Sequence, residues 1–183
     1  MATTKQSPSD DAFLRSSKSS TNYGSEEYLR NGGWGDFYLS LIKFDISTLP
    51  STITLAEIKF YVISDVYTPL SSTKWQRIES SWSEGTVTYG TKPTGAVNNT
   101  GAAVNIPTVG EWLTIDITNL YRDWKDETYD NYGIALNGNA SSYSAKFSRW
   151  ASKEYTTDTT KRPYLEITYT AVVDTGNFFQ LFS

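Results

Sequence analysis

The stretch from Asp36 to Ile63 constrains the fold of this chain more than any other part. Residues 57–62, with the sequence EIKFYV, alternate between polar or amphipathic and apolar side chains, the pattern of a half-buried β-strand. The preceding run from Phe37 to Leu41 is apolar on both faces. Such a strand is either central in its sheet or covered on its outer side. We expect the cover to come from a late helix, from the 90–110 loop or from a neighbouring subunit.

The rest of the chain contains further short strand patterns separated by turn signals. The same alternation occurs over residues 112–117 and 164–169. One short helix is expected over residues 119–125, with Thr118 as its N-cap. We also expect strands at 12–15, 28–31, 37–45, 74–79, 132–136 and 144–150. The pattern predicts an all-β fold, an antiparallel jelly-roll-type β-sandwich with one short helix.

The two ends of the chain differ from this body. Residues 1–10 are predicted to form a polar arm, residues 11–170 the β-sandwich domain and residues 171–183 a tail. The tail ends with apolar side chains, which are unfavourable in water unless they are covered. We expect these side chains either to fold back onto the domain or to dock on a neighbouring subunit. If they dock on a neighbour, they are the residues through which the protein assembles. These residues are Phe178, Phe179, Leu181 and Phe182.

Composition excludes several classes of function. The chain has no Cys and no His, which rules out Ser-His-Asp and Cys-His nucleophile systems, thiolate sites and zinc sites. A net charge of −4 without a basic stripe argues against nucleic-acid binding. We find neither a signal peptide nor a membrane-spanning run in this sequence, so we expect no membrane insertion.

Exposed aromatic and cationic residues are the candidates for sugar binding. Trp34 lies in a Gly-rich turn and Trp112 points outward by alternation, so either indole could stack on a sugar ring. Lys43, Arg149 and Lys153 are candidates for binding uronate carboxylates, for which arginine offers a two-pronged fork. The alternative is that these side chains are solvated or are paired with Asp45 and Glu154.

Carboxylates offer two further kinds of chemistry. Asp11, together with Asp116 or Glu166, could hold a structural calcium ion between the first strand and a late strand. No EF-hand spacing is present, and we expect no cofactor to be required. A glycosidase needs two carboxylates about 5–10 Å apart across a cleft, and the sequence does not single out such a pair. We therefore expect a protein that is not an enzyme.

Several motifs in order along the chain resemble the DNRLRE-type domain, a β-sandwich family related to carbohydrate-binding modules of surface and extracellular proteins. The matching pieces extend over nearly the whole chain, outside the first residues and the tail. They are DAFLR at 11–15, NYGS at 22–25, YLR at 28–30, IKFDI at 42–46 with Leu49-Pro50, residues 82–93, residues 112–124, SKE at 152–154 and RPYLEI at 162–167. Tyr89 stands where the family usually has Trp. The resemblance implies a non-catalytic module, and some relatives bind alginate-type polysaccharides.

Two functional hypotheses follow from these observations. The first is a surface-display protein, a structural or decoration subunit of a virion or extracellular assembly, which could also bind glycans. Its partners would be copies of itself or other assembly proteins, contacted through the termini. The alternative is a dedicated carbohydrate-binding module for an acidic polysaccharide such as alginate, detached from a larger extracellular enzyme or adhesin. Both hypotheses place the protein on a virion surface or outside the cell.

Overall fold

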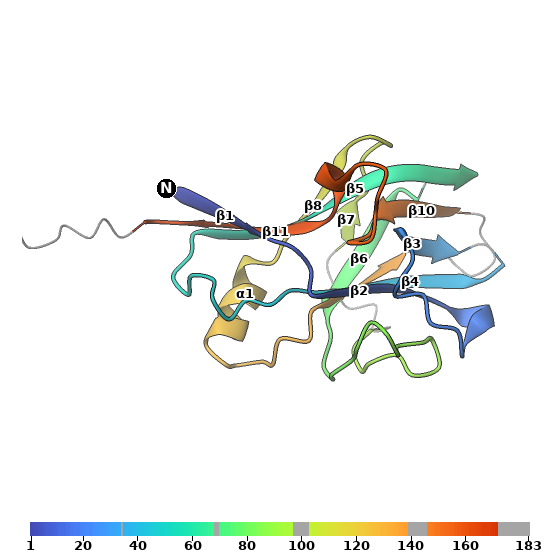
Figure 1. Ribbon diagram of the computed structural model, residues 1–183, viewed down its shortest axis with the longest axis horizontal. Coiled ribbons are helices and arrows are strands. Elements are labelled where there is room, and N and C mark those ends of the chain that lie inside the picture. Colours follow the sequence, from blue (N-terminus) through green and yellow to red (C-terminus); the bar gives the residue numbers. More distant parts are fainter. Residues whose placement is uncertain (34, 68–69, 97–102, 139–145, 172–183) are drawn as a thin grey trace, which may run out of the picture.

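The fold is a β-sandwich made from one curled antiparallel sheet (Figure 1). The computed structural model describes residues 1–33, 35–67, 70–96, 103–138 and 146–171. One half of the sheet has the order β1-β11-β5-β8 and the other has β10-β3-β4-β9-β6-β7, with β2 paired to β4. The prediction of an all-β sandwich is confirmed. The strands are β1 (Ala2–Gln6), β2 (Asp10–Arg15), β3 (Tyr28–Gly33), β4 (Phe37–Lys43), β5 (Leu55–Tyr67), β6 (Ser72–Arg77), β7 (Ala103–Asn105), β8 (Trp112–Asp116), β9 (Ile134–Gly138), β10 (Lys146–Ala151) and β11 (Tyr164–Tyr169).

Strand β5 joins the two halves because it pairs with strands of both. Its first part pairs with β8 and β11, and its later part pairs with β10. The predicted alternation of β5 is confirmed: Ile58, Phe60 and Val62 are fully buried. Their side chains join the inward residues of β4, β8, β9, β10 and β11 in the main core.

The helix α1 (Thr118–Lys125) closes one end of this core. Leu120, Tyr121 and Trp124 are its buried residues, as the sequence predicts. The predicted cap is wrong. The Asp116 carboxylate accepts a hydrogen bond from the backbone N–H of Thr118 at 2.8 Å, while the Thr118 hydroxyl accepts from the backbone N–H of Ala56. The helix begins at Thr118, one residue earlier than expected, and the Thr118 hydroxyl connects its first turn to β5.

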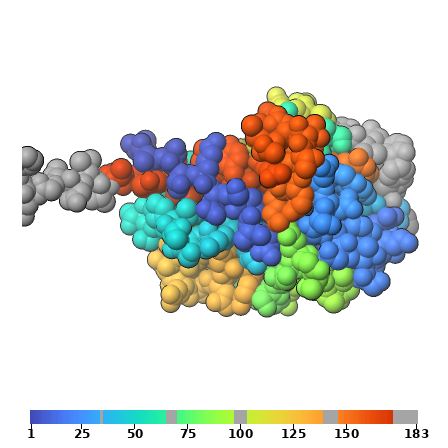
Figure 2. Space-filling model, in the orientation of Figure 1, coloured from blue at the N-terminus to red at the C-terminus, as the bar shows by residue number. Residues whose placement is uncertain are grey.

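A second, smaller core lies on the other side of β4. Leu39 and Leu41 are fully buried and pack with residues of β2 and of the segment 78–96. Ile78, Val87 and Ala96 supply the cover from that segment, which forms part of the lower surface in Figure 2. The cover expected for Phe37–Leu41 thus comes mainly from residues 78–96 and β2. Only Ala96 belongs to the expected 90–110 loop, and α1 packs on the main core instead.

The first residues form a strand where the sequence predicts a polar arm. Ala2–Gln6 pair in register with Tyr169–Leu165 as β1, the edge strand beside β11. Figure 1 shows β1 and β11 side by side, extending away from the body of the sandwich. Strand β1 has no buried residue, so its stability comes from the backbone ladder rather than from an apolar face. The predicted tail lies outside the described residues from residue 172 onward.

Candidate functional site: an arginine–aromatic cluster

Arginine and aromatic side chains gather on the neighbouring strands β3 and β10. In the register between these two strands, Arg30 lies directly opposite Arg149, and Tyr28 lies opposite Ala151. Phe13 of β2, Tyr38 of β4 and Phe147 of β10 join them through ring contacts. We call this group the arginine–aromatic cluster: Phe13, Tyr23, Tyr28, Arg30, Tyr38, Phe147 and Arg149.

A glycine allows β3 and β10 to approach in this register. Gly32 lies opposite Phe147 and has a φ of +123°, a conformation that L side chains rarely adopt. A Cβ atom at this position would lie 2.3 Å from the carbonyl oxygen of Lys146. The glycine therefore helps to fix the pairing that brings Arg30 to Arg149.

Both guanidinium groups rest on aromatic rings, and they share one ring. The Arg30 guanidinium carbon lies 4.8 Å from the Tyr28 ring centroid, and that of Arg149 lies 4.9 Å from the same centroid. Arg30 also lies 4.9 Å from the Phe13 ring and donates a hydrogen bond to the Tyr28 hydroxyl at 2.9 Å. These contacts hold the planar groups in place at modest exposure, at a distance where the ring quadrupole attracts a cation.

The charges of this pair are not balanced by the surrounding protein. Like charges directly opposite each other on neighbouring strands repel. Within the part of the chain that the structure describes, neither Arg30 nor Arg149 forms an ion pair, and the buried Nε atom of each has no hydrogen-bond partner. A guanidinium group that lacks an internal anion can bind the carboxylate of a ligand through two parallel hydrogen bonds.

A third arginine nearby behaves differently, because it has an internal partner. Arg15 Nε donates to Asp36 Oδ2 at 2.5 Å, and Ser16 and Ser17 donate to the same carboxylate. Burial by itself would raise the pKa of Asp36, but hydrogen bonds from Arg15, Ser16 and Ser17 outweigh it and hold that pKa well below its usual range. Arg15 and Asp36 therefore stabilise the start of β4 beside the cluster.

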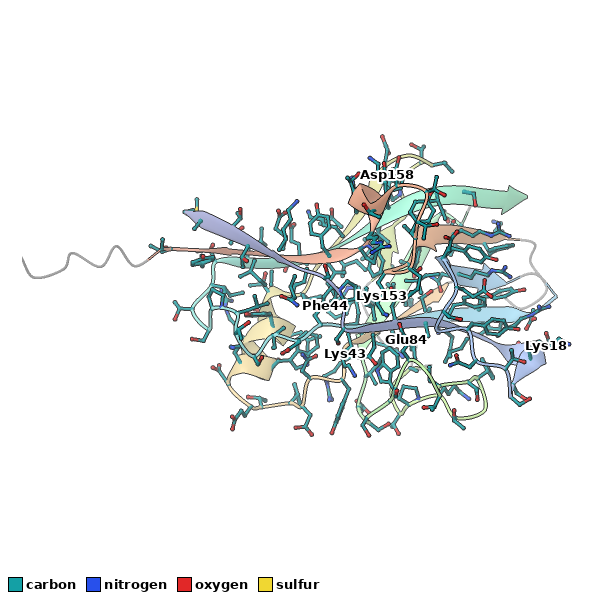
Figure 3. The ribbon with its side chains drawn as sticks, viewed as in Figure 1. Lys18, Lys43, Phe44, Glu84, Lys153 and Asp158 are labelled. Carbon is teal, nitrogen blue, oxygen red and sulfur yellow. The ribbon has the colours of Figure 1, made fainter. Side chains whose placement is uncertain are left out.

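Two of the predicted cationic residues, Lys43 and Lys153, form ion pairs with acidic side chains. Lys43 ends β4, whereas Tyr38 lies near its start. The Lys43 ammonium forms an ion pair with Asp10 at 3.0 Å and lies 5.2 Å from the Trp82 ring. Figure 3 shows Lys43 near Glu84 and Lys153, far from Lys18, which follows β2. The structure thus places Lys43 and Lys153 beside acidic partners.

Lys153 belongs to a cluster of acids around the predicted metal ligand Asp11. Ligand oxygens of Asp11, Glu84 and Glu154 all lie within 4.8 Å of one another. The Lys153 ammonium lies 2.8 Å from Glu84 and 2.6 Å from Glu154, and its backbone N–H donates to Asp11. Burial raises the pKa of Asp11 well above its usual value. The hydrogen bond from the Lys153 N–H opposes this shift, and the negative charges of Glu154 and Glu84 add to it.

This arrangement bears on where a calcium ion could bind. The residues expected to join Asp11 lie elsewhere: Asp116 accepts a hydrogen bond from the Thr118 N–H at the start of α1, and Glu166 lies 3.6 Å from the Lys5 ammonium on β1. The oxygens that surround Asp11 come from Glu84 and Glu154 instead, and the Lys153 ammonium already supplies a cation to them. Calcium binding stays a prediction, but the acids that lie beside Asp11 are Glu84 and Glu154 rather than the predicted Asp116 or Glu166.

The predicted platform residue Trp112 does point outward, and it has aromatic neighbours. Tyr61 of β5 and Tyr164 of β11 each meet its ring edge-on, with centroids 5.3 Å away. Lys161 lies over the Tyr61 ring and Lys5 over the Tyr164 ring. This row, on the outer face of the β11-β5-β8 half, is a second surface with an aromatic character.

Two groups of predicted residues cannot be placed. Trp34 lies outside the described residues, and so do Phe178, Phe179, Leu181 and Phe182. Their roles stay predictions.

The sequence analysis missed every member of the cluster except Arg149, and the most important of these are Tyr28 and Arg30. A period of two puts these side chains on one face of the predicted strand at 28–31, which was a usable signal. The pairing of β3 with β10 could not be predicted from the sequence, because it joins segments that are far apart in the chain.

Comparison with known protein families places this β-sandwich in a family of carbohydrate-binding modules. The model of carbohydrate-binding module family 96 matches residues 2–169, so this chain belongs to that family. No curated protein sequence matches the chain. Among the described residues, no helix is long and apolar enough to cross a membrane.

Proposed function

We propose that this protein is a non-catalytic module that binds an acidic polysaccharide, of the uronate-containing class to which alginate belongs, through the arginine–aromatic cluster. The observation that carries the proposal is the pair Arg30 and Arg149, directly opposite each other on the shared Tyr28 ring. Neither has a carboxylate partner among the described residues. A uronate carboxylate would supply the missing anion and remove the repulsion between the two guanidinium groups.

The aromatic members of the cluster give the binding surface its second property. Tyr23 stacks on the buried Phe13 at 4.4 Å, and both Tyr23 and Tyr28 are partly exposed. An aromatic side chain with one face available offers an apolar surface to the C–H groups of a pyranose ring, while the arginines bind its carboxylate. The stacking also reduces the side-chain entropy that the arginines lose on binding.

The arrangement of carboxylates supports binding rather than hydrolysis. The group of carboxylates formed by Asp11, Glu84 and Glu154 contains a buried aspartate and is bridged by Lys153. General acid–base cleavage of a glycosidic bond needs two carboxyl groups that face a substrate from opposite sides.

The test is the affinity for alginate of the variants Arg30→Ala and Arg149→Ala, measured by isothermal titration calorimetry. Each variant should bind about 10- to 100-fold more weakly, because a hydrogen bond to a charged group contributes about 1.5–3 kcal/mol. Arg30→Lys keeps the charge and loses the fork, so it should also weaken binding.

The matched control is Arg77→Ala. Arg77 also rests on a tyrosine ring, that of Tyr129, but it is paired with Glu79 and lies on β6. This variant should bind alginate as the wild type does. Unchanged affinity in the double variant Arg30→Ala/Arg149→Ala, with its melting temperature preserved, would rule out the cluster as the binding site.

The row around Trp112 is the second candidate surface for the same ligand class. Lysines at both ends, Lys5 and Lys161, would attract an acidic chain. Trp112→Ala and Trp34→Ala, titrated with alginate in the same way, separate these surfaces from the cluster. Loss of affinity in Trp112→Ala alone would move the site to the β11-β5-β8 half.

We also propose, from the sequence, a setting for this binding activity. The apolar side chains near the C-terminus favour assembly with copies of the chain or with other proteins of a virion or extracellular structure. A glycan-binding module displayed on such a surface would combine both hypotheses.

A further inference from the structure

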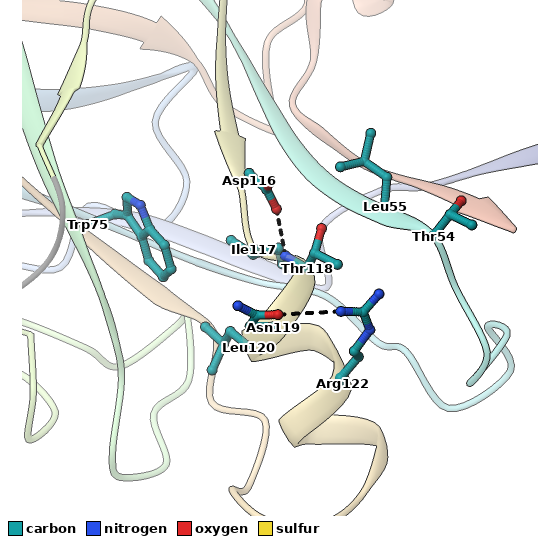
Figure 4. Close-up of a pocket in the computed structure, with 9 residues that line it drawn as sticks. All are labelled: Thr54, Leu55, Trp75, Asp116, Ile117, Thr118, Asn119, Leu120 and Arg122. Carbon is teal, nitrogen blue, oxygen red and sulfur yellow. Dashed lines mark hydrogen bonds between the residues drawn. The ribbon is translucent and has the colours of Figure 1, made fainter.

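An open groove of about 460 Å³ lies beside the start of α1, between residues of the two halves of the sheet. Trp75 of β6 forms one wall, and the junction of β8 with α1 forms the other. In Figure 4 the Trp75 indole stands opposite Asn119 and Arg122, with Asp116 above them. The groove shares no residue with the arginine–aromatic cluster, and it contains a different set of chemical groups.

Several polar groups in the groove are only partly engaged by the protein. Asp116 accepts from the Thr118 N–H through Oδ1, and its Oδ2 has no hydrogen bond to any described residue. Asn119 accepts from Arg122 through Oδ1 at 3.4 Å, which leaves its amide N–H groups available. Arg122 donates to the Ile53 carbonyl oxygen at 3.2 Å and has no carboxylate partner within the described ranges. Asp116, Asn119 and Arg122 are all exposed.

These groups match a neutral sugar better than an acidic one. A carboxylate oxygen beside an amide N–H can engage two adjacent sugar hydroxyls, one as donor and one as acceptor. The indole of Trp75 provides an apolar wall for the C–H face of the ring. Asp116 and Arg122 carry opposite charges, so the side chains that line the groove have no net charge, whereas the cluster carries two positive charges.

We propose that this groove is a second carbohydrate-binding site, which takes a neutral pyranose with adjacent hydroxyl groups. The inference does not depend on the cluster being the site for acidic glycans, because no residue is shared. With both sites active, one molecule binds two chemically different polysaccharides and can link them.

The experiment titrates the full chain with cellohexaose, xylohexaose and mannohexaose, by calorimetry and by ¹H–¹⁵N NMR. At least one of these should bind and shift the amide signals of Thr118 and Asn119. Asn119→Ala and Asp116→Asn should each weaken that binding about tenfold, the change expected for one hydrogen bond to a charged or strongly polar group. An Asn side chain at position 116 can still accept the hydrogen bond from the Thr118 N–H, so the start of α1 should be preserved.

Controls separate this site from the cluster. Asp126→Asn removes an exposed carboxylate just after the end of α1, outside the groove, and should leave neutral-sugar binding unchanged. Arg30→Ala/Arg149→Ala should also retain it, while Asn119→Ala should retain alginate binding. The proposal is overturned if none of the three oligosaccharides binds, or if binding survives in the double variant Asp116→Asn/Asn119→Ala.

Discussion

At the scale of single residues, the Tyr28 ring organises the candidate site. Two guanidinium groups lie at nearly equal distances from its centroid, 4.8 Å and 4.9 Å. The Phe13 ring also contacts the Arg30 guanidinium, and the Phe147 ring of β10 contacts that of Arg149. An arginine held in this way keeps its charge accessible without moving freely, so less conformational entropy is lost when a ligand binds.

Asp36 makes the stability of this region dependent on pH. Its folded-state pKa lies below the unfolded value of about 3.9, so the stabilisation is complete at neutral pH and is lost as pH falls below about 4. Asp36→Asn should therefore reduce the free energy of unfolding by about 1.5–3 kcal/mol at pH 7 and by clearly less at pH 3. Urea denaturation at both pH values measures this.

The exposed residue Asp126 is the control for the same substitution. Asp126→Asn should change stability little at either pH. An equal effect of Asp36→Asn at pH 7 and pH 3 would contradict the role assigned to its ionised form.

At the scale of elements, the segment 78–96 acts as a lid on the outer side of β4 even though it contains no named helix or strand. Its position is fixed by side-chain anchors rather than by a ladder. The Trp82 indole N–H donates to the Tyr132 carbonyl oxygen at 2.8 Å, and Asn22 donates to the carbonyl oxygens of Glu84 and Val87. The segment is thus part of the folded body.

Substitutions of Ile78 test how tightly the segment 78–96 packs on β4. Ile78 is fully buried in the smaller core, so Ile78→Ala should destabilise the protein by about 2–5 kcal/mol, and Ile78→Val by about 0.5–1.5 kcal/mol. Val109→Ala, at a residue that is 49% exposed, should change stability by less than about 0.5 kcal/mol. Denaturant unfolding measures all three, and an Ile78→Ala effect no larger than that of Val109→Ala would show that the cover is not packed.

The elements also show what the sequence could and could not predict. Strands β5, β8 and β11 follow from alternation, because each has one buried face, and the bounds of β11 agree with the prediction. Strand β1 could not be predicted in this way, because Ala2–Gln6 bury no apolar face. Arg149 was a predicted candidate, but its pairing with Arg30 depends on a register that no local pattern contains.

At the scale of the whole molecule, the two halves of the sheet share β5 and carry different surfaces. The β10-β3 side bears the arginine–aromatic cluster, and the outer face of the β11-β5-β8 half bears the row around Trp112. The groove lies at the edge between β6 and β8. The proposed binding sites therefore lie on separate surfaces of one folded domain.

The proposed assembly through the C-terminal residues is tested on the whole chain. Deletion of residues 177–183 should leave the melting temperature unchanged and reduce the mass of the assembled species, because it removes four apolar side chains that would otherwise be buried against a neighbour. Light scattering measures the mass. An identical mass for the full and truncated chains would contradict assembly through this segment.

The pairing of β1 with β11 has a mechanical consequence. Ala2 lies opposite Tyr169, so both strands reach the same end of the ladder there. A pulling force applied between these two residues acts across the strands, along the hydrogen bonds of an antiparallel pair. It would load the ladder one residue pair at a time, from Ala2 toward Gln6, instead of shearing all five pairs together. Under tension the domain should yield first by peeling β1, while the strands that carry the cluster and the groove stay folded.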